Sequence, residues 1–484
     1  MTQFSQNLAL TASSSSGGGP GPIVSPQGFI DINFNSVTGN TVPTSLFGSS
    51  MATDTGGGNG PYELMASSTF RTAAYTTAGF GLPGMHLRIN GENRLWPYGN
   101  TVDTAQLDRI CTGLPHIIDL STATWSLTLG GWNAAGDGNG NTLLPTDPTT
   151  AATLATTTAN YLITKGMPCN KYELFNEPDG YLSATTYASI FSAVGKALHL
   201  VDPSYQLAGP CESWMNGSDL QTAAATGVMG FAPYHAYPWN SYSYDTVNPD
   251  PGEPRLTAWQ NAKQRAASDA KNARAALVAA NQPNIPTALG EFNADTSGSN
   301  PAMATNEGAV FVLLYTMFAF NTDPLTRYGC VWDWLGDGYF GLIIDPNNNP
   351  GGYTNYAVTP TGYALKICRQ YLGGTQVNVP SSMPSTGTVN GEATSIAAMC
   401  TKNGSKFALL LLNYTNNAVA ANNITLSQWP VNTTGTGTIY QLQISASTAG
   451  PGQAPIQTTL NVVNGIVSLP QIPAKSVTLL TSSL

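Results

Sequence analysis

The stretch KYELFNEPDG, residues 171–180, places a short apolar run directly before a cluster of polar side chains. The run YELF is typical of a strand whose side chains alternate between two faces, and Pro178 ends it. Asn176 and Glu177 then fall at the carboxyl end of this strand. Because only 9% of the chain is charged, so many carboxylates in one place indicate a functional site.

Seven further segments of this kind lie between about residue 40 and residue 375. The eight predicted strands are SLFGSSM, GMHLRIN, ATWSLTLGGWN, KYELFNEP, YQLAGPC, GFAPYHAY, IPTALGEFN and RYGCVWDW. Alanine-rich stretches long enough for helices separate several of them, so the pattern predicts an α/β fold, a closed (β/α)8 TIM barrel. A doubly wound open sheet is the alternative, but residues 48–60 lack the glycine pattern of its phosphate-binding turn.

The strand pattern changes after residue 375, where helical segments stop and short strands recur. Turn residues separate these strands, so we predict that residues 376–484 form a C-terminal all-β sandwich domain. Residues 29–375 are assigned to the catalytic barrel. The Ser/Gly/Pro-rich residues 1–28 are interpreted as a flexible leader, and the strand that follows it is a candidate to join the sandwich.

Composition excludes several classes of partner. A net charge of −9 opposes binding to nucleic acid or to an anionic membrane, both of which need clustered Lys and Arg. No stretch approaches the roughly 18 apolar residues of a membrane span. The chain shows no signal peptide, but a surface with so few ionisable groups suits an extracellular or periplasmic protein. We therefore expect a neutral polar partner, with the oligomeric state left open.

Cysteine spacing gives no sign of a metal or redox site. The six cysteines stand at positions 111, 169, 211, 330, 368 and 400, without a C-x-x-C pair or a histidine at ligand spacing. Disulfides and buried thiols remain equal alternatives. The run GDGNGNT from residue 136 starts like a calcium loop, but Pro148 stands where such a loop has glutamate. We predict no metal and no cofactor.

A second glutamate occupies the same setting as Glu177. Glu291 lies at the end of IPTALGEFN, the seventh predicted strand, so both carboxyls would project into one bowl. Cleavage of a glycosidic bond needs two facing carboxyls, and a separation of about 5 to 5.5 Å gives retention through a covalent intermediate. The pair predicts a retaining glycosidase, with Glu177 protonated until the bond breaks and Glu291 ionised throughout.

Other residues at the strand ends can support this pair. Arg88 and Tyr237, on the second and sixth strands, are expected to reach Glu291 and keep it ionised. Asn176 is placed to bind the sugar 2-hydroxyl. Glu173, in the body of the fourth strand, is expected to be a buried structural carboxylate paired with an inward Arg or Lys.

Histidine and tryptophan side chains near the same rim are candidates to bind substrate. His235 is assigned to substrate contact, with a buried histidine in the barrel mouth as the equal alternative. Trp332 or Trp334 is expected to form the floor of the subsite that binds the cleaved sugar, because the apolar faces of sugars stack on aromatic rings. Further candidate platforms are Trp96, Trp132 and Trp239.

Together these motifs resemble those of clan A retaining glycoside hydrolases: N-E-P after strand four, glutamate on strand seven, H-x-Y on strand six and arginine on strand two. ELFNEPDG, HAYP and GEFNADTSG, with the trailing sandwich, are most similar to glycoside hydrolase family 39, followed by families 79 and 30. The resemblance implies that Glu177 is the acid/base, Glu291 the nucleophile and Asn176 the ligand of the 2-hydroxyl.

The substrate implied is an extracellular oligo- or polysaccharide, with β-xylosides, other β-glycosides or an exopolysaccharide as candidates. Two alternatives stay open. One is a carbohydrate-binding surface protein of the same fold without turnover, and the other is a transglycosylase. The residues do not distinguish exo from endo action.

Overall fold

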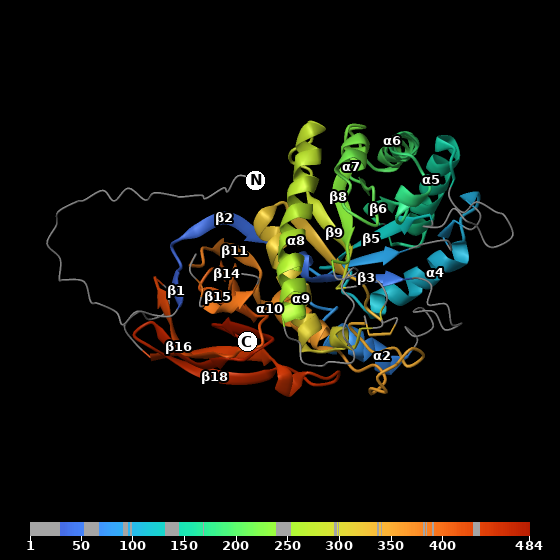
Figure 1. The fold of residues 1–484 in the computed structure, drawn as a ribbon. Helices are drawn as coiled ribbons and strands as arrows, with labels where there is room; N and C mark the ends of the chain where they lie inside the picture. The colour runs from blue at the N-terminus through green and yellow to red at the C-terminus, as the bar shows by residue number, and fades with distance from the viewer. Residues whose placement is uncertain are drawn as a thin grey trace.

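The structure of the chain, a computed structural model, is described for residues 30–52, 67–90, 95–96, 99–130, 145–167, 169–238, 253–294, 298, 300–335, 338–339, 341–380, 383, 385–389, 392–428 and 436–484. For residues 253–262, 385–389, 392–395, 420–422 and 436 only the backbone is described. Figure 1 shows a barrel with surrounding helices and, beside it, a second β-structure in orange and red.

Eight parallel strands form the barrel. They are β3 (Gly48–Ala52), β4 (His86–Asn90), β5 (Thr124–Leu129), β6 (Lys171–Leu174), β7 (Gln206–Ala208), β8 (Met229–Ala236), β9 (Thr287–Phe292) and β10 (Thr326–Val331). The sheet closes because β10 pairs with both β9 and β3. Each predicted segment coincides with one barrel strand, so the (β/α)8 barrel expected from the sequence is confirmed.

One helix follows each barrel strand. In order these are α2 (Ser68–Thr72), α4 (Thr104–Gly113), α5 (Pro148–Thr164), α6 (Ala184–Val201), α7 (Gly217–Ala224), α8 (Glu253–Ala279), α9 (Asn306–Thr322) and α10 (Pro360–Tyr371). Local sequence sets where they begin: Asp147 caps α5 by accepting from the Thr150 amide, and Ser183 caps α6 in the same way. These caps fix the residue at which each helix begins, after the loop that follows its barrel strand.

The second β-structure is one ten-stranded sheet. Its strands are, in sheet order, β1 (Ile30–Asn33), β16 (Val419–Ser427), β19 (Ile466–Ile472), β18 (Ile456–Val463), β17 (Thr436–Ile444), β20 (Ser476–Thr481), β15 (Lys406–Asn413), β14 (Ala397–Asn403), β11 (Gly374–Val377) and β2 (Val37–Val42). A separate hairpin joins β12 (Ser385–Val389) to β13 (Glu392–Ser395). The sheet curls to form the predicted sandwich.

The N-terminal strands β1 and β2 belong to this sheet and lie at its two opposite edges. Figure 1 shows them in blue, β1 beside β16 and β2 beside β11. The expected assignment of all residues from 29 to 375 to the barrel therefore changes, because the first barrel strand begins at Gly48. The strand after the leader joins the sandwich, whereas the leader itself, residues 1–28, lies outside the described residues.

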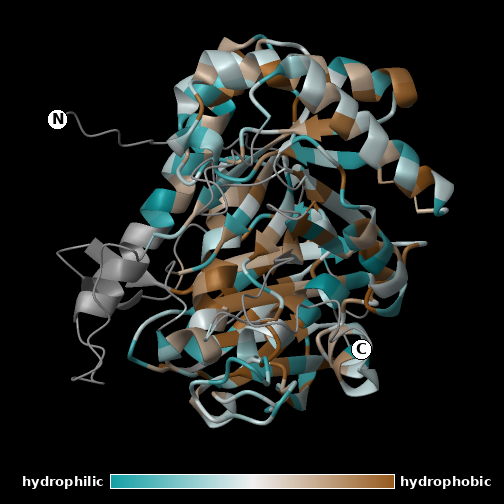
Figure 2. Cartoon of the chain, turned by 90° about the vertical axis from the view of Figure 1, so that its right-hand side faces the viewer, coloured by the Kyte–Doolittle hydropathy of each residue, from teal (hydrophilic) through white to brown (hydrophobic). Residues whose placement is uncertain are grey.

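Two apolar cores result from this arrangement. One fills the curled sheet and brings Ile32 of the edge strand β1 together with Leu409 and Leu480 of the neighbouring strands β15 and β20. The opposite sheet face, with Leu410 and Leu479, joins the large barrel core. Figure 2 shows the hydrophobic residues, in brown, gathered in the interior strands.

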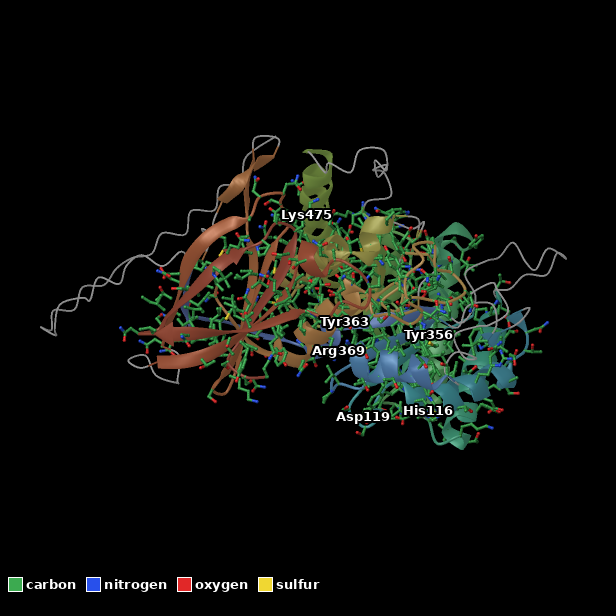
Figure 3. All side chains as sticks on the ribbon, turned by 90° about the horizontal axis from the view of Figure 1, so that it is seen from below. His116, Asp119, Tyr356, Tyr363, Arg369 and Lys475 are labelled. Atoms are coloured by element: carbon green, nitrogen blue, oxygen red, sulfur yellow. The ribbon has the colours of Figure 1, made fainter. Side chains whose placement is uncertain are left out.

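Helices α9 and α10 connect the barrel to the sandwich. Figure 3 shows Tyr363 and Arg369 of α10 between the orange and red sheet and the blue and green barrel. Lys475, in the turn before β20, pairs with Glu307 of α9 at 3.0 Å. Within the described part of the chain, no helix combines the length and apolarity needed to cross a membrane.

All six cysteines lie within the described residues, and each is a free thiol. Five of them are buried, and Cys111 is half-buried. Burial raises the pKa of Cys169 to about 12, so this thiol stays protonated and unreactive. Of the two alternatives left open by the sequence, the structure has the buried thiols.

Leu479→Ala should lower the free energy of unfolding by about 2–5 kcal/mol, because the fully buried side chain fills the junction between sheet and barrel. Urea denaturation followed by tryptophan fluorescence measures the change. Leu200→Ala, at a side chain that is 89% exposed, is the matched control. Equal stability of the two variants would contradict a packed junction.

Candidate active site

The barrel strands bring five polar side chains to the carboxyl-terminal mouth of the barrel. Glu291 is the penultimate residue of β9, Tyr237 follows β8 directly, and Glu177 lies three residues after β6. Arg88 is the central residue of β4 and is fully buried. His235 lies one residue before the end of β8 and is also fully buried. The sequence-predicted residues Glu177, Glu291, Arg88 and Tyr237 therefore meet in one place.

The two glutamates face each other at short range. One carboxylate oxygen of Glu177 and one of Glu291 lie within 4.8 Å of each other. Retaining glycosidases separate their carboxyls by about 5 to 5.5 Å, whereas inverting enzymes need about 6.5–9.5 Å to admit a water. The Glu291 side chain is 8% exposed and that of Glu177 is 26% exposed. The spacing therefore fits the retaining geometry, with solvent access on the Glu177 side.

Arg88 organises the floor of the site. Its Nε donates to Glu173 Oε2 at 2.6 Å, and its Nη2 donates to Asn176 Oδ1 at 2.7 Å. Its Nη1 donates to Glu291 Oε2 at 3.0 Å and to Ser50 Oγ at 3.3 Å. Burial alone would lower the pKa of Arg88, but the charges of Glu173 and Glu291 raise it well above its usual value. The guanidinium stays charged and orients both functional side chains.

Asn176 takes its orientation from this contact. Because its Oδ1 accepts from Arg88, the Nδ2 donors are left for another partner. The side chain is only 5% exposed, at the end of the segment that follows β6. An amide donor beside the two carboxyls is the group that a sugar hydroxyl would need.

Glu173 is the structural carboxylate expected from the sequence. The side chain is 1% exposed and is paired with Arg88. Its Oε1 accepts from Ser126 Oγ at 2.9 Å, and its Oε2 lies 3.4 Å from both Thr128 Oγ1 and Cys211 Sγ. Sequence reasoning missed these partners, although the alternate polar positions of TWSLTL in β5 carry the signal of two inward side chains.

Glu291 is held by a donor on each oxygen. The Tyr237 hydroxyl donates a short hydrogen bond to Oε1, and Arg88 donates to Oε2. Burial, followed by the charge and hydrogen bond of Glu291, raises the pKa of Tyr237 well above its usual value. The hydroxyl therefore remains protonated and donates. The two hydrogen bonds fix the direction of the Glu291 carboxyl group.

Glu177 is paired with His235. The Nδ1 atom of His235 lies 2.9 Å from Glu177 Oε1 and 4.0 Å from Glu291 Oε2. Burial alone would raise the pKa of Glu177, but the hydrogen bond and charge of His235, together with the charge of Arg88, lower it below its usual value. The expected protonated Glu177 is thus wrong for the unliganded site. The hydrogen bond favours a carboxylate at Glu177 and a proton on Nδ1.

His235 itself is placed differently from the expected substrate contact. Its side chain is fully buried behind the carboxyls, so it acts on substrate only through Glu177. Its Nε2 faces Gly290, where an added Cβ would lie 3.6 Å from that atom. The histidine is buried, as one of the two alternatives expected, but only its Nδ1 has a hydrogen-bond partner, and the buried Nε2 has none in the described residues. Sequence spacing did not reveal Glu177 as the partner.

The backbone around Glu177 is left-handed at two residues that are not glycine. Phe175 has φ 61° and Glu177 has φ 50°. Such conformations cost roughly 1–3 kcal/mol each and persist only where surrounding contacts impose them. The Phe175 ring is fully buried, and Gly130 makes room for it, since a Cβ there would lie 2.7 Å from the ring. The Glu177 amide donates to the carbonyl of Cys211 at 2.7 Å. These contacts hold Glu177 in place.

The tryptophans after β10 differ in placement. Trp334 is 1% exposed and packs against Phe70 and Phe80, so its expected role as a sugar platform is wrong. It turns into the core because β10 ends at Val331 and strand alternation no longer applies. Trp332, directly after the strand, is half-buried and remains a platform candidate.

Three other tryptophans were candidate platforms. Trp96 is fully buried, and its Nε1 donates to Thr158 Oγ1 at 3.1 Å. It packs edge-on against Phe175 and belongs to the core. Trp132 and Trp239 lie outside the described residues, as does the run from residue 136 that resembles a calcium loop.

Glu177, His235 and Glu291 also have the donor atoms of a cation site, all within 4.8 Å of one another. Both oxygens of Glu291 already accept hydrogen bonds, and one of the donors is a charged guanidinium. A cation would have to displace or oppose that charge. The contacts therefore favour a carboxyl pair working without a metal.

Comparison with known proteins finds similar structures but no similar sequences. No protein-family model and no curated protein sequence matches the chain. A family 51 α-L-arabinofuranosidase, AbfB from Bifidobacterium longum, superposes with a TM-score of 0.68 at 16% identity, over 94% of this chain and 99% of that one.

Two further solved structures share the architecture. The GH39 enzyme from Xanthomonas axonopodis pv. citri has a TM-score of 0.61 at 14% identity, over 93% of this chain and 96% of its own. The family 30 xylanase Xyn30A from Clostridium acetobutylicum has a TM-score of 0.59 at 15% identity, over 94% and 99%. The likeness to glycoside hydrolase families 39 and 30 is thus confirmed at the level of the fold.

His235→Gln should raise the pKa of the Glu177 carboxyl, because the histidine charge is lost while the burial of Glu177 remains. Carbon-detected NMR of the protein labelled at Asp and Glu carboxyls measures the titration in both forms. Asp119, whose pKa is lowered by its bonds to Ser121 in the α4–β5 connection, is the internal control and should not move. An unchanged Glu177 midpoint would contradict the pairing.

Proposed function

We propose that the protein is a retaining β-glycoside hydrolase that cleaves an oligo- or polysaccharide by double displacement. The observation that carries this proposal is the pair Glu177 and Glu291, with oxygens within 4.8 Å in unequal surroundings. Glu291 accepts hydrogen bonds from two donors, and Glu177 is partly exposed and is hydrogen-bonded to His235. The shared fold with an arabinofuranosidase and a xylanase gives further support.

In the first step Glu291 attacks the anomeric carbon of the bound sugar. The bond from that carbon to the leaving oxygen breaks, and a glycosyl ester forms on Glu291. Glu177 delivers a proton to the leaving oxygen, drawing on the proton that it shares with His235 Nδ1. As Glu291 loses its charge, the hydrogen bonds from Arg88 and Tyr237 weaken, and the oxygen that does not join the sugar remains a carbonyl acceptor.

In the second step water attacks the same carbon. Glu177, now a carboxylate beside His235, takes the proton from the water, and the ester bond to Glu291 breaks. Two inversions restore the original configuration. Throughout, the amide donors of Asn176 bind the 2-hydroxyl, an interaction that strengthens toward the transition state.

The charges around the pair favour a neutral sugar. Arg88 is the cation that contacts the carboxyls, and all three of its nitrogens already donate to protein acceptors. The buried His235 is already paired with Glu177, and the carboxylates of the pair would repel a uronic acid. β-Xylosides and other neutral β-glycosides are therefore the proposed substrates, and an extracellular or periplasmic location remains part of the proposal.

The test is chemical rescue by azide. Glu177→Ala should lower kcat by about 10²–10⁴-fold on glycosides with poor leaving groups, because proton donation is lost. With an aryl β-glycoside, added azide should restore turnover and give a β-glycosyl azide. Glu291→Ala should be inactive until azide gives the α-glycosyl azide. Nuclear magnetic resonance of the products assigns each configuration.

Glu173→Gln is the matched control, since it changes a nearby buried glutamate that does not face the anomeric carbon. It should keep measurable turnover without azide. A wild-type protein that binds glycans but hydrolyses none of the β-glycosides would overturn the proposal in favour of a binding protein. Release of longer saccharides in place of free sugar would assign it to transglycosylation.

A further inference from the structure

Two loops beside the acid/base form a continuous wall. The Cys211 carbonyl, in the loop after β7, accepts a hydrogen bond from the Glu177 amide at 2.7 Å. In the same loop, the amide and hydroxyl of Ser213 donate to the two oxygens of Asp179, at 3.1 and 2.6 Å. Asp179 lies two residues after Glu177. The loops after β6 and β7 are therefore tied together next to the proton donor.

This wall carries two exposed aromatic side chains. Trp214 is 41% exposed and follows Ser213 directly, and Tyr181 is 42% exposed and lies two residues after Asp179. Trp214 is the most exposed tryptophan side chain in the described part of the chain. Exposed aromatic rings clustered beside a site are unusual unless something covers them.

The Trp214 ring is braced by a neighbouring side chain. The guanidinium carbon of Arg265, on α8, lies 5.4 Å from the ring centroid. Arg265 is itself fixed by Asp269, whose carboxylate lies 2.8 Å from its Nε. The ring is thus supported by α8 while two-fifths of the residue surface remains open, which is how a flat binding platform is built.

The position of these loops beside Glu177 indicates which part of the substrate they would contact. Trp214 lies three residues after Cys211, so their Cα atoms are at most about 11 Å apart. Glu177 must stand beside the oxygen that departs, and Cys211 contacts the backbone of Glu177. Trp332 lies instead next to β9, on the side of the nucleophile. The loop that carries Trp214 therefore starts beside the proton donor, on the side where the leaving half of the substrate would lie.

We propose that Trp214 and Tyr181 form a subsite for a sugar ring on the leaving-group side of the cleaved bond. The inference rests on the proposed function and extends it: the natural leaving group is itself a saccharide, and the substrate continues at least one ring beyond Glu177. Apolar faces of a sugar stack on such rings, and their hydroxyls point outward to polar neighbours.

Glu212 supplies a suitable polar neighbour. It lies two residues before Trp214 and is only 4% exposed. Burial, followed by the charge of Asp219, raises the pKa of Glu212 to about 9. A hydrogen bond between Glu212 and Asp219 contributes to this shift, so the two carboxyl groups form a pair that favours retention of a proton. The wall therefore suits a neutral, hydroxyl-rich ring, and Asp179 and Asp219 disfavour an anionic one.

The experiment uses the glycosyl-enzyme itself. The 2,4-dinitrophenyl 2-deoxy-2-fluoro-β-glycosides of xylose, glucose and galactose are used to trap the ester on Glu291. Xylobiose or cellobiose is then added as acceptor. The acceptor hydroxyl attacks the anomeric carbon, its proton passes to Glu177, and the ester bond breaks to restore the Glu291 carboxylate. The rate of regained activity against acceptor concentration reports occupancy of the leaving-group subsite.

In the wild type, reactivation should rise with acceptor and saturate. Trp214→Ala should raise the acceptor concentration for half-saturation about tenfold, which is the loss of one stacked ring. Reactivation by water alone is measured for each variant and serves as the baseline for its own acceptor curve. Tyr181→Ala should act in the same direction. Leu200→Ala, far out on α6 and 89% exposed, is the matched control.

Each result decides between the two proposals. Acceptor saturation unchanged by Trp214→Ala, in a protein that does form the ester, overturns the subsite alone. A wild type that forms no ester, yet binds xylobiose or cellobiose by calorimetry with an affinity that Trp214→Ala weakens, overturns the hydrolase alone. A wild type that forms no ester and binds neither disaccharide overturns both.

Discussion

The site depends on one buried guanidinium. Arg88 is shared among Glu173 of β6, Asn176 in the segment directly after β6, and Glu291 of β9. A buried charge is tolerable only when its partners satisfy it, and removal of one partner leaves another exposed to a low-dielectric interior. The barrel therefore couples stability to geometry: the contacts that make Arg88 tolerable in the core are the ones that set the direction of the nucleophile.

The two functional glutamates owe their difference to their neighbours. Glu291 faces a guanidinium, which can only donate, and a phenol hydroxyl that donates to it, so both of its oxygens act as acceptors. Glu177 faces an imidazole, which can both hold and release a proton, and has a larger open surface. Identical side chains thus acquire opposite tasks from one cation, one hydroxyl and one histidine.

Much of this arrangement could be predicted from the sequence. Strand ends in a parallel barrel share one face, so the neighbourhoods of Glu177 and Glu291 followed from their positions after apolar runs. The bond between Glu177 and His235 could not be predicted, because it depends on the relative heights of β6 and β8, which are not adjacent. Trp334 was misplaced because the chain bends after β10, and Trp214 was missed because loops carry no periodicity.

The N-terminal strands have a consequence for assembly of the chain. β1 and β2 occupy the two edges of the ten-stranded sheet, and the contact from Ser427 to Ile32 spans 395 residues. Strand β1 cannot pair until β16 has been synthesised, and β2 cannot pair until β11 has followed the whole barrel, so both strands wait for partners that are distant in sequence. A fragment cut at the end of the barrel would expose unpaired strand borders on both pieces, which invites association with other chains. Although the fold has two architectural units, the ten-stranded sheet is complete only when segments from both sides of the barrel have been synthesised and have paired.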